Sequence, residues 1–245
     1  MSLVSSGTQE RPSDMTMRPD PSCYLCGRVI DHDAPDDEMQ LSMDHIPPKQ
    51  FFPQPLRKAV NPNLVVAASH KICNNTYKND EEYFYHSLYP LVANTNHNMA
   101  QAIFTDLVRR RTAGQTPSLI RRIFSRASGI TQGGIVLPHG RIEFTVDLAR
   151  IQRIAIKIAR GVLFLETGLC FPQSSVVDIR LCEKESEVPE MYQLSWQGAP
   201  IKGAYPNVFS YRYFALDSDN ALILSLMFWG AFMFCITIQK AAPPA

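Results

Sequence analysis

The sequence predicts an α+β protein in two parts, a small N-terminal module and a mixed C-terminal domain that ends in an antiparallel sheet. Three observations favour this class. Paired Cys and His residues occur between positions 23 and 73, helical periodicity dominates residues 80–161, and strand-like segments separated by turn residues dominate residues 208–238. At 245 residues and 45% hydrophobic, the chain is long enough to bury a second core beside the module.

The predicted boundaries divide the chain into three segments. Residues 1–20 are rich in Ser, Pro, Asp and Thr and lack the apolar core of a signal peptide, so we expect a disordered tail and a cytoplasmic protein. Residues 21–90 form the module. Residues 91–245 form a domain of helices and antiparallel strands, which we expect to position substrate, regulate the module or bind a partner.

Two pairs of residues have the spacing of a structural zinc site. Cys23 and Cys26 enclose two residues on an expected tight turn, and His70 and Cys73 enclose two residues at the start of an expected helix. One tetrahedral zinc ion takes four such ligands. The six cysteines are too sparse for a disulfide framework. Two alternatives stay open: three unligated thiols beside a surface histidine, or a His70 that works in an active site.

Polar motifs lie between and after these pairs, namely Asp44-His45, Asn63-Leu64 and Asn74-Asn75. Taken in order with the Cys and His pairs, they resemble the HNH endonucleases of the ββα-metal type. The resemblance covers about residues 21–85 and implies a zinc-stabilised His-Asn-Asn variant. The expected ββα elements are a strand at residues 40–45, a second strand at 63–69 and a helix at 71–77.

The resemblance implies metal-dependent hydrolysis of DNA phosphodiester bonds. His45 would be the general base, because an imidazole with a pKa of about 6.5 can accept a proton at cellular pH. Asp44 and Asn74 would hold one Mg²⁺ or Mn²⁺ through oxygen, and Asn63 would brace the loop that orients His45. The family's last lysine stands one position later in this chain, which leaves Asn75 as an alternative ligand.

Basic residues gather at particular places, although the net charge is only +1. Residues 100–127 are expected to form two helices broken at 114–117, and residues 147–161 an amphipathic helix with a basic face. Basic side chains can bind phosphates, but for 147–161 an ordinary solvated face is at least as good an interpretation. We expect nucleic-acid contacts from Lys49, Arg109, Arg110, Arg111, Arg121 and Arg122.

The C-terminal part contains the hardest segment, residues 221–238, which holds no charge and meets the lower bound for a membrane span. A strand-like stretch at 208–214, a turn at 217–220 and a turn at Trp229-Gly230 favour three buried antiparallel strands instead. A membrane-tethered partner protein is the alternative. Elsewhere we expect a helix at residues 80–89 and a hairpin at residues 130–146.

The predicted function is cleavage of DNA, with RNA not excluded as substrate. By fold-level analogy, small HNH proteins with an appended domain resemble nuclease effectors of bacterial antiviral defence, in which an ATPase or sensor protein controls cutting. An oligomer is compatible with this function. The main alternative is a catalytically silent, zinc-containing module that binds DNA or protein.

Overall fold

A computed structural model of the chain describes most of the sequence between residues 21 and 239. The predicted tail at 1–20, the supporting residue Asn63 and the turn at 217–220 lie outside the described residues. The residues that the structure describes are 21–31, 35, 37–60, 64–114, 117–125, 127–131, 133–138, 143, 145–171, 175–205, 207–216 and 221–239.

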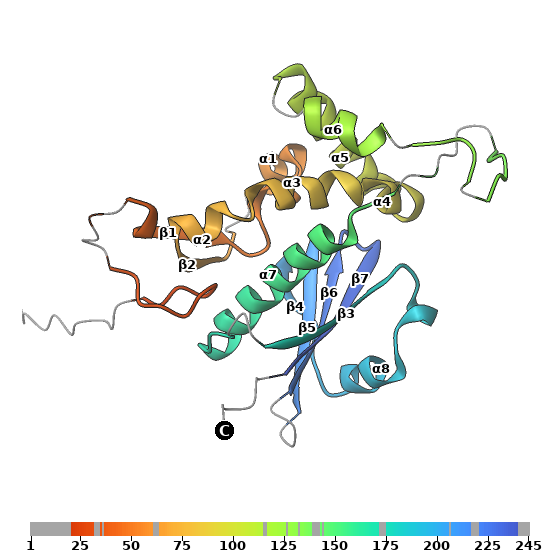
Figure 1. Cartoon of the computed structure of the whole chain (residues 1–245). Coiled ribbons are helices and arrows are strands. Elements are labelled where there is room, and N and C mark those ends of the chain that lie inside the picture. Colours follow the sequence, from red (N-terminus) through yellow and green to blue (C-terminus); the bar gives the residue numbers. More distant parts are fainter. Residues whose placement is uncertain are drawn as a thin grey trace, which may run out of the picture.

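The N-terminal part is built on a two-stranded antiparallel sheet and the short helix that follows it (Figure 1). Strand β1 (Leu41–His45) pairs with β2 (Val66–His70), and helix α2 (Lys71–Asn75) begins directly after β2. The expected order of two strands and a helix is present, although the second strand begins at Val66 rather than at position 63. The remaining elements here are η1 (Asp37–Met39), η2 (Lys49–Phe51) and α1 (Gln54–Val60).

Helices dominate the middle of the chain, close to where the sequence predicts them. The side chain of Asn96 accepts a hydrogen bond from the backbone N–H of Met99 and so caps the start of α5. The expected break at 114–117 is confirmed, because Gly114 has a positive φ of 69° after α5 and Pro117 begins α6. The helices are α3 (Lys78–Ser87), α4 (Tyr89–Thr95), α5 (His97–Thr112) and α6 (Pro117–Phe124).

Where the structure describes the segment of the hairpin predicted at residues 130–146, it shows isolated antiparallel contacts. Among the described residues of this segment, the antiparallel pairs are Ser128 with Glu143 and Ile130 with Val136, and neither belongs to a named strand. Residues 132, 139–142 and 144 lie outside the described part of the chain. Val136 is 74% exposed.

Helix α7 (Leu148–Thr167) confirms the predicted amphipathic helix and extends it to Thr167. Asp147 caps its start by accepting from the backbone N–H of Arg150 at 3.3 Å. Gly168 ends it with a φ of 70°, a conformation that glycine adopts without steric cost. The apolar face is buried through Ile151, Ile154, Ala155 and Ile158.

The C-terminal part is a five-stranded antiparallel sheet with strand order β3-β7-β6-β5-β4. Residues 221–238, which the sequence left between buried strands and a membrane span, form β6 and β7 with a turn at Trp229 and Gly230. Among the described residues, no helix is long and apolar enough to cross a membrane. The strands are β3 (Val176–Cys182), β4 (Lys202–Tyr205), β5 (Phe209–Leu216), β6 (Ala221–Phe228) and β7 (Phe232–Gln239).

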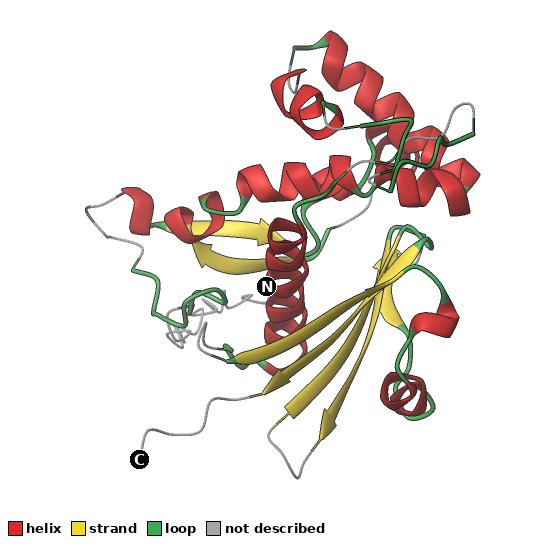
Figure 2. Ribbon diagram, turned by 45° about the vertical axis from the view of Figure 1, so that its right-hand side comes forward, coloured by secondary structure: helices red, strands yellow, loops and turns green. Residues whose placement is uncertain are grey.

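Both faces of this sheet are covered, which explains why β6 and β7 lack a simple alternation of apolar and polar residues. Figures 1 and 2 show α7 against one face and α8 (Glu190–Trp196) beside the other. On β6, Leu224 and Phe228 join the core that includes α7, whereas Ile223 packs with residues on the α8 side. There the Trp196 indole donates to Ser225 at 2.8 Å. Strands β3 and β4 and helix α8 have no counterpart in the sequence prediction.

One apolar core runs from the N-terminal part into the sheet. The rings of Phe51 and Phe84 stack at 4.9 Å, and both pack against Trp229 at the end of β6. The boundary predicted between residues 90 and 91 falls inside α4. The C-terminal sheet therefore packs against η2 and α3 of the N-terminal half through Trp229.

Candidate active site and metal centre

The four residues predicted to bind zinc lie together. The ligand atoms of Cys23, Cys26, His70 and Cys73 all lie within 4.8 Å of one another. The knuckle that carries the first two is closed by a hydrogen bond from the Gly27 N–H to the Cys23 carbonyl at 2.7 Å, and the other two stand where β2 passes into α2. A cluster of three cysteines and one histidine in this arrangement could hold a structural metal such as zinc.

The imidazole of His70 faces the thiols. Its Nδ1 lies 3.4 Å from the sulfur of Cys26 and 3.9 Å from that of Cys73, and the residue is 1% exposed. Burial raises the pKa of Cys26, but hydrogen bonds led by those from Arg28 outweigh burial and lower it to about 7. The thiolate of Cys26, which is the metal-binding form, is therefore accessible near neutral pH, whereas burial raises the pKa of the Cys23 thiol and raises that of Cys73 to about 12.

A second group of predicted residues gathers at a hollow of about 360 Å³ beside the end of β1 and the end of α2. Asp44 and His45 contribute to its wall from β1, Asn74 from α2 and Lys49 from η2. Asn75, the alternative ligand to Asn74, also lines the hollow. The structure thus brings together residues that the sequence separates by up to 31 positions, from Asp44 to Asn75.

Asp44 is held by several partners below this hollow and is 5% exposed. The Tyr24 hydroxyl donates to its Oδ2 at 2.5 Å, and the Lys157 ammonium lies 2.7 Å from the same oxygen. The amide of Asn74 has two useful orientations. In one, its oxygen accepts from Lys157 at 3.3 Å; in the other, its nitrogen donates to both oxygens of Asp44 at 3.2 Å.

Lys157 and Glu81 are the site residues that sequence reasoning missed. The Lys157 ammonium forms an ion pair with Glu81 as well as with Asp44, although Lys157 is only 1% exposed. In the sequence, Glu81 is one of several acidic residues at a helix start, and Lys157 is one of several basic residues on an amphipathic helix. No pattern in the sequence indicated this ion pair, because the two residues are 76 positions apart in the chain.

His45 is partly buried next to these charges. Burial and then the positive charge of Lys49 lower the pKa of His45 from its ordinary value of 6.5, and Lys157 acts in the same direction. The carboxylate of Asp44 opposes them, but the net direction is downward. A lowered pKa keeps the imidazole neutral at pH 7, which is the form that accepts a proton.

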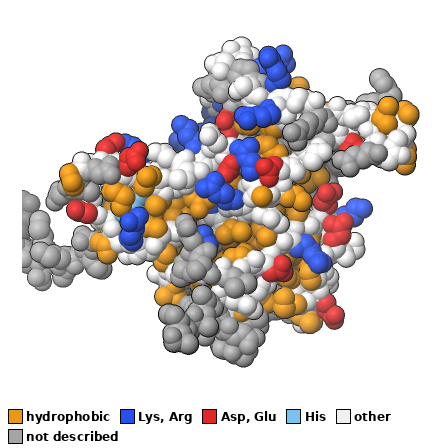
Figure 3. Space-filling view, viewed as in Figure 1, with side chains coloured by type: hydrophobic (Ala, Val, Ile, Leu, Met, Phe, Trp, Pro, Cys, Tyr) orange, Lys and Arg blue, Asp and Glu red, His pale blue; other side chains and the backbone are white. Residues whose placement is uncertain are grey.

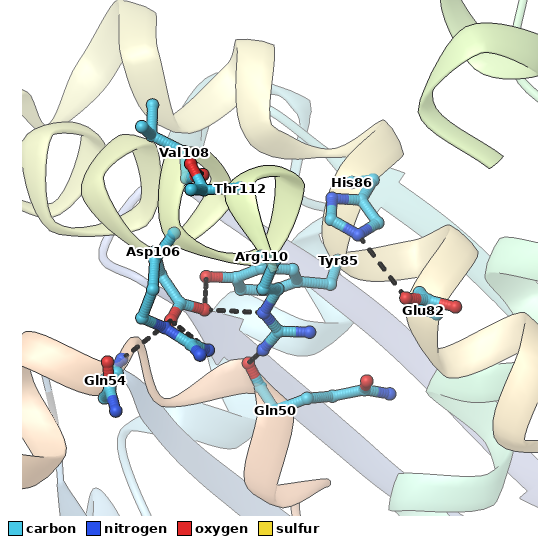
Figure 4. Close-up of polar contacts among 10 residues, drawn as sticks. Gln50, Gln54, Glu82, Tyr85, His86, Asp106, Val108, Arg110 and Thr112 are labelled. Carbon is cyan, nitrogen blue, oxygen red and sulfur yellow. Dashed lines mark hydrogen bonds and ion pairs between the residues drawn. The ribbon is translucent and has the colours of Figure 1, made fainter. Parts of the chain in front are cut away.

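Two of the arginines predicted to contact nucleic acid have partners inside the protein (Figure 4). Asp106 is fully buried and accepts hydrogen bonds from Arg109 at 3.1 Å and from Arg110 at 2.8 Å. Arg110 is 8% exposed and also lies over the ring of Tyr85. We therefore correct the expectation for Arg110: its guanidinium neutralises a buried carboxylate and is not presented to a phosphate.

The other predicted arginines are on the surface. Arg111, Arg121 and Arg122 are exposed, and Figure 3 shows basic side chains at the top of the molecule, over α6. On the basic face predicted for residues 147–161, two arginines bind a carboxylate of the protein itself. Arg150 and Arg153 form ion pairs with Asp80 at 2.6 and 2.5 Å. These two residues fasten α7 to α3.

Comparison of the chain with protein-family models, with curated proteins and with solved structures finds no match. Fold and site together define an α+β protein with antiparallel sheets and a Cys3His cluster suited to a structural metal.

Proposed function

We propose that this protein is an endonuclease of the HNH type, which hydrolyses DNA phosphodiester bonds at the hollow beside β1. The observation that carries the proposal is the meeting of Asp44, His45, Asn74 and Lys49 around that one hollow. Hydrolysis of a phosphodiester requires a base for the attacking water and positive charge near the phosphate. The lining residues provide both kinds of group.

Each residue has a distinct proposed role. His45, with its lowered pKa, removes a proton from the attacking water, and the Lys49 ammonium contacts a phosphate oxygen. Tyr24 fixes the Asp44 carboxylate by its 2.5 Å hydrogen bond. The order β1, β2, α2 and the adjoining Cys3His cluster support the HNH assignment, with zinc as the structural metal.

The donor set below the hollow fits a hard cation. Oxygens of Asp44, Asn74 and Glu81 converge on one positive charge, the ammonium of Lys157. Carboxylate and amide oxygens are the ligands that Mg²⁺ and Mn²⁺ prefer. Asp44 and Asn74 would hold such an ion, and when bound it would neutralise charge that develops on the phosphate.

Exposed arginines on α5 and α6 are the proposed contacts to the DNA backbone, namely Arg111, Arg121 and Arg122. Control of such a nuclease by an ATPase or sensor protein in antiviral defence is the corresponding proposal for its biology. The second candidate is a catalytically silent zinc-containing module that binds DNA or protein. The ion pair between Lys157 and Asp44 favours it, because that pair engages a predicted metal ligand.

The test is cleavage of supercoiled plasmid by the purified protein in Mg²⁺ or Mn²⁺, beside a His45→Ala variant. We expect nicking by the wild type and a loss of about 10²–10⁴-fold in the variant, the usual contribution of a general base. His97→Ala, an exposed histidine at the start of α5, is the matched control and should cut normally. Equal cutting by wild type and His45→Ala would remove His45 from the mechanism, and plasmid binding without cutting would favour the silent module.

A further inference from the structure

The Lys157 ammonium lies among oxygen donors of residues that line the hollow. It lies 2.7 Å from Asp44 Oδ2 and forms a shorter contact with Glu81 Oε1, and in the first of the two orientations of the Asn74 amide it also lies 3.3 Å from Asn74 Oδ1. The three oxygens come from β1, α2 and α3, whereas the ammonium comes from α7. We name Asp44, Asn74 and Glu81 the oxygen cage.

Charge explains why the cage contains a cation at all. Two carboxylates, 5% exposed at Asp44 and largely buried at Glu81, cannot stay ionised side by side without a positive partner. Lys157 supplies that partner from within the chain. The helix that carries Lys157 is held in place, because the neighbouring residues Ile154 and Ile158 are buried in the core.

Burial excludes a direct role of Lys157 in binding the substrate. At 1% exposure, and with its ammonium also 5.2 Å from the ring centre of Tyr77, Lys157 does not reach the solvent side of the hollow. Lys49 lines the hollow and Lys157 lies beneath it. The buried lysine therefore acts on the carboxylates rather than on a phosphate.

We propose that Lys157 is the resident cation of the oxygen cage and that a divalent metal ion can enter the cage only by displacing the Lys157 ammonium. Mg²⁺ binds oxygen at about 2.0–2.1 Å, so its ligands must close around the point that the ammonium now holds. Two cations at that point would repel each other strongly in a buried site. Lys157 thus sets the metal affinity of this centre. The link from that affinity to DNA cleavage rests on the proposed function, whereas the displacement of Lys157 by a metal ion does not.

The experiment measures Mn²⁺ binding, with no nucleic acid present, by electron paramagnetic resonance of the free ion and by calorimetry. The protein is first loaded with zinc so that the Cys3His cluster does not contribute. Lys157→Met, which shortens the side chain by one atom and removes the charge, should bind one Mn²⁺ at least tenfold more tightly than the wild type. Binding no tighter than the wild type would overturn the proposal.

Three further variants make the result specific to the cage. Lys157→Gln keeps hydrogen-bond donors for the two carboxylates, so it carries the same test if Lys157→Met does not fold, and it should also bind more tightly. Glu81→Gln, added to either variant, should reverse the gain. Lys202→Met breaks a different Lys–Glu pair, with Glu166 on α7, and should leave Mn²⁺ affinity unchanged.

The outcome separates this inference from the proposed function. Tighter Mn²⁺ binding by Lys157→Met together with no plasmid cutting by any variant would support the resident cation and contradict the nuclease. Unchanged Mn²⁺ affinity together with His45-dependent cutting by the wild type would support the nuclease and contradict the resident cation.

Discussion

The indole N–H of Trp229 donates to the backbone carbonyl of Phe51 at 2.9 Å, across 178 positions of the chain. This bond joins the turn between β6 and β7 to the last residue of η2, the element that carries Lys49. The two rings also pack with centroids 5.6 Å apart. The C-terminal sheet therefore fixes one wall of the candidate site.

Replacing Trp229 with Phe should destabilise the protein by about 1–3 kcal/mol, because the buried carbonyl of Phe51 then lacks its donor while most ring packing remains. Urea unfolding followed by circular dichroism measures the change. Trp196→Phe is the matched control, since its indole donates to a side-chain hydroxyl and the expected cost is smaller. An unchanged unfolding midpoint for Trp229→Phe would show that the bond contributes nothing.

Removal of one thiol should reveal the metal cluster. We expect Cys26→Ser to lower bound zinc well below one ion per chain and to lower the melting temperature, because a structural zinc contributes folding free energy. Elemental analysis and thermal melting measure the two effects. Cys170→Ser is a close control, since its sulfur lies near the knuckle, 3.4 Å from the Tyr24 carbonyl, but outside the cluster. Normal zinc content in Cys26→Ser would disprove this ligand set.

Stability at low pH should depend on Asp106. Burial raises its pKa, but the charge of Arg110 and hydrogen bonds from both neighbouring arginines outweigh burial and hold the pKa below the ordinary 3.8. A carboxyl with a lowered folded-state pKa stabilises the fold above the unfolded-state pKa and loses that contribution as pH falls through the folded-state value.

Asp106→Asn should therefore cost about 3–5 kcal/mol at pH 7, because it leaves Arg110 with a buried, unpaired charge. The difference from wild type should shrink once the pH falls below about 3.8. Urea titrations at pH 3 to 7 give both curves. Asp178→Asn, on the exposed side of β3, should follow the wild type throughout. A gap that stays constant to pH 3 would contradict the assigned role of Asp106.

Substitution of the surface arginines should weaken DNA binding, whereas substitution of the buried Arg110 should lower stability. If Arg121 and Arg122 contact phosphates, the double Ala variant should bind duplex DNA more weakly. The slope of the logarithm of the binding constant against the logarithm of the salt concentration should become smaller in magnitude by about one to two. Fluorescence anisotropy across a range of NaCl concentrations measures this. Arg110→Ala should instead lower the melting temperature, since it leaves Asp106 buried without its partner. If the salt dependence of the double variant equals that of the wild type, Arg121 and Arg122 do not contact DNA phosphates.

Local signals in the sequence were sufficient for several parts of this protein. The two-residue spacing of Cys23 with Cys26 and of His70 with Cys73 predicted a four-residue cluster, because a knuckle and a helix start present such pairs on one side. The uncharged run at residues 221–238 predicted buried strands, because turn residues divide it. The break between α5 and α6 followed from Gly114 and Pro117, whose backbone preferences act without any neighbour.

Tertiary structure alone decided how the charged side chains are used. Lys157, Arg150 and Arg110 all looked like residues of solvated or phosphate-binding faces, yet each pairs with a carboxylate inside the protein. The pairing of Lys157 with Asp44 and Glu81 depends on α7 lying between the N-terminal part and the sheet, which no local pattern specifies. Burial makes the charges of Lys157 and Arg110 require partners, and only the folded chain determines which partner is within reach.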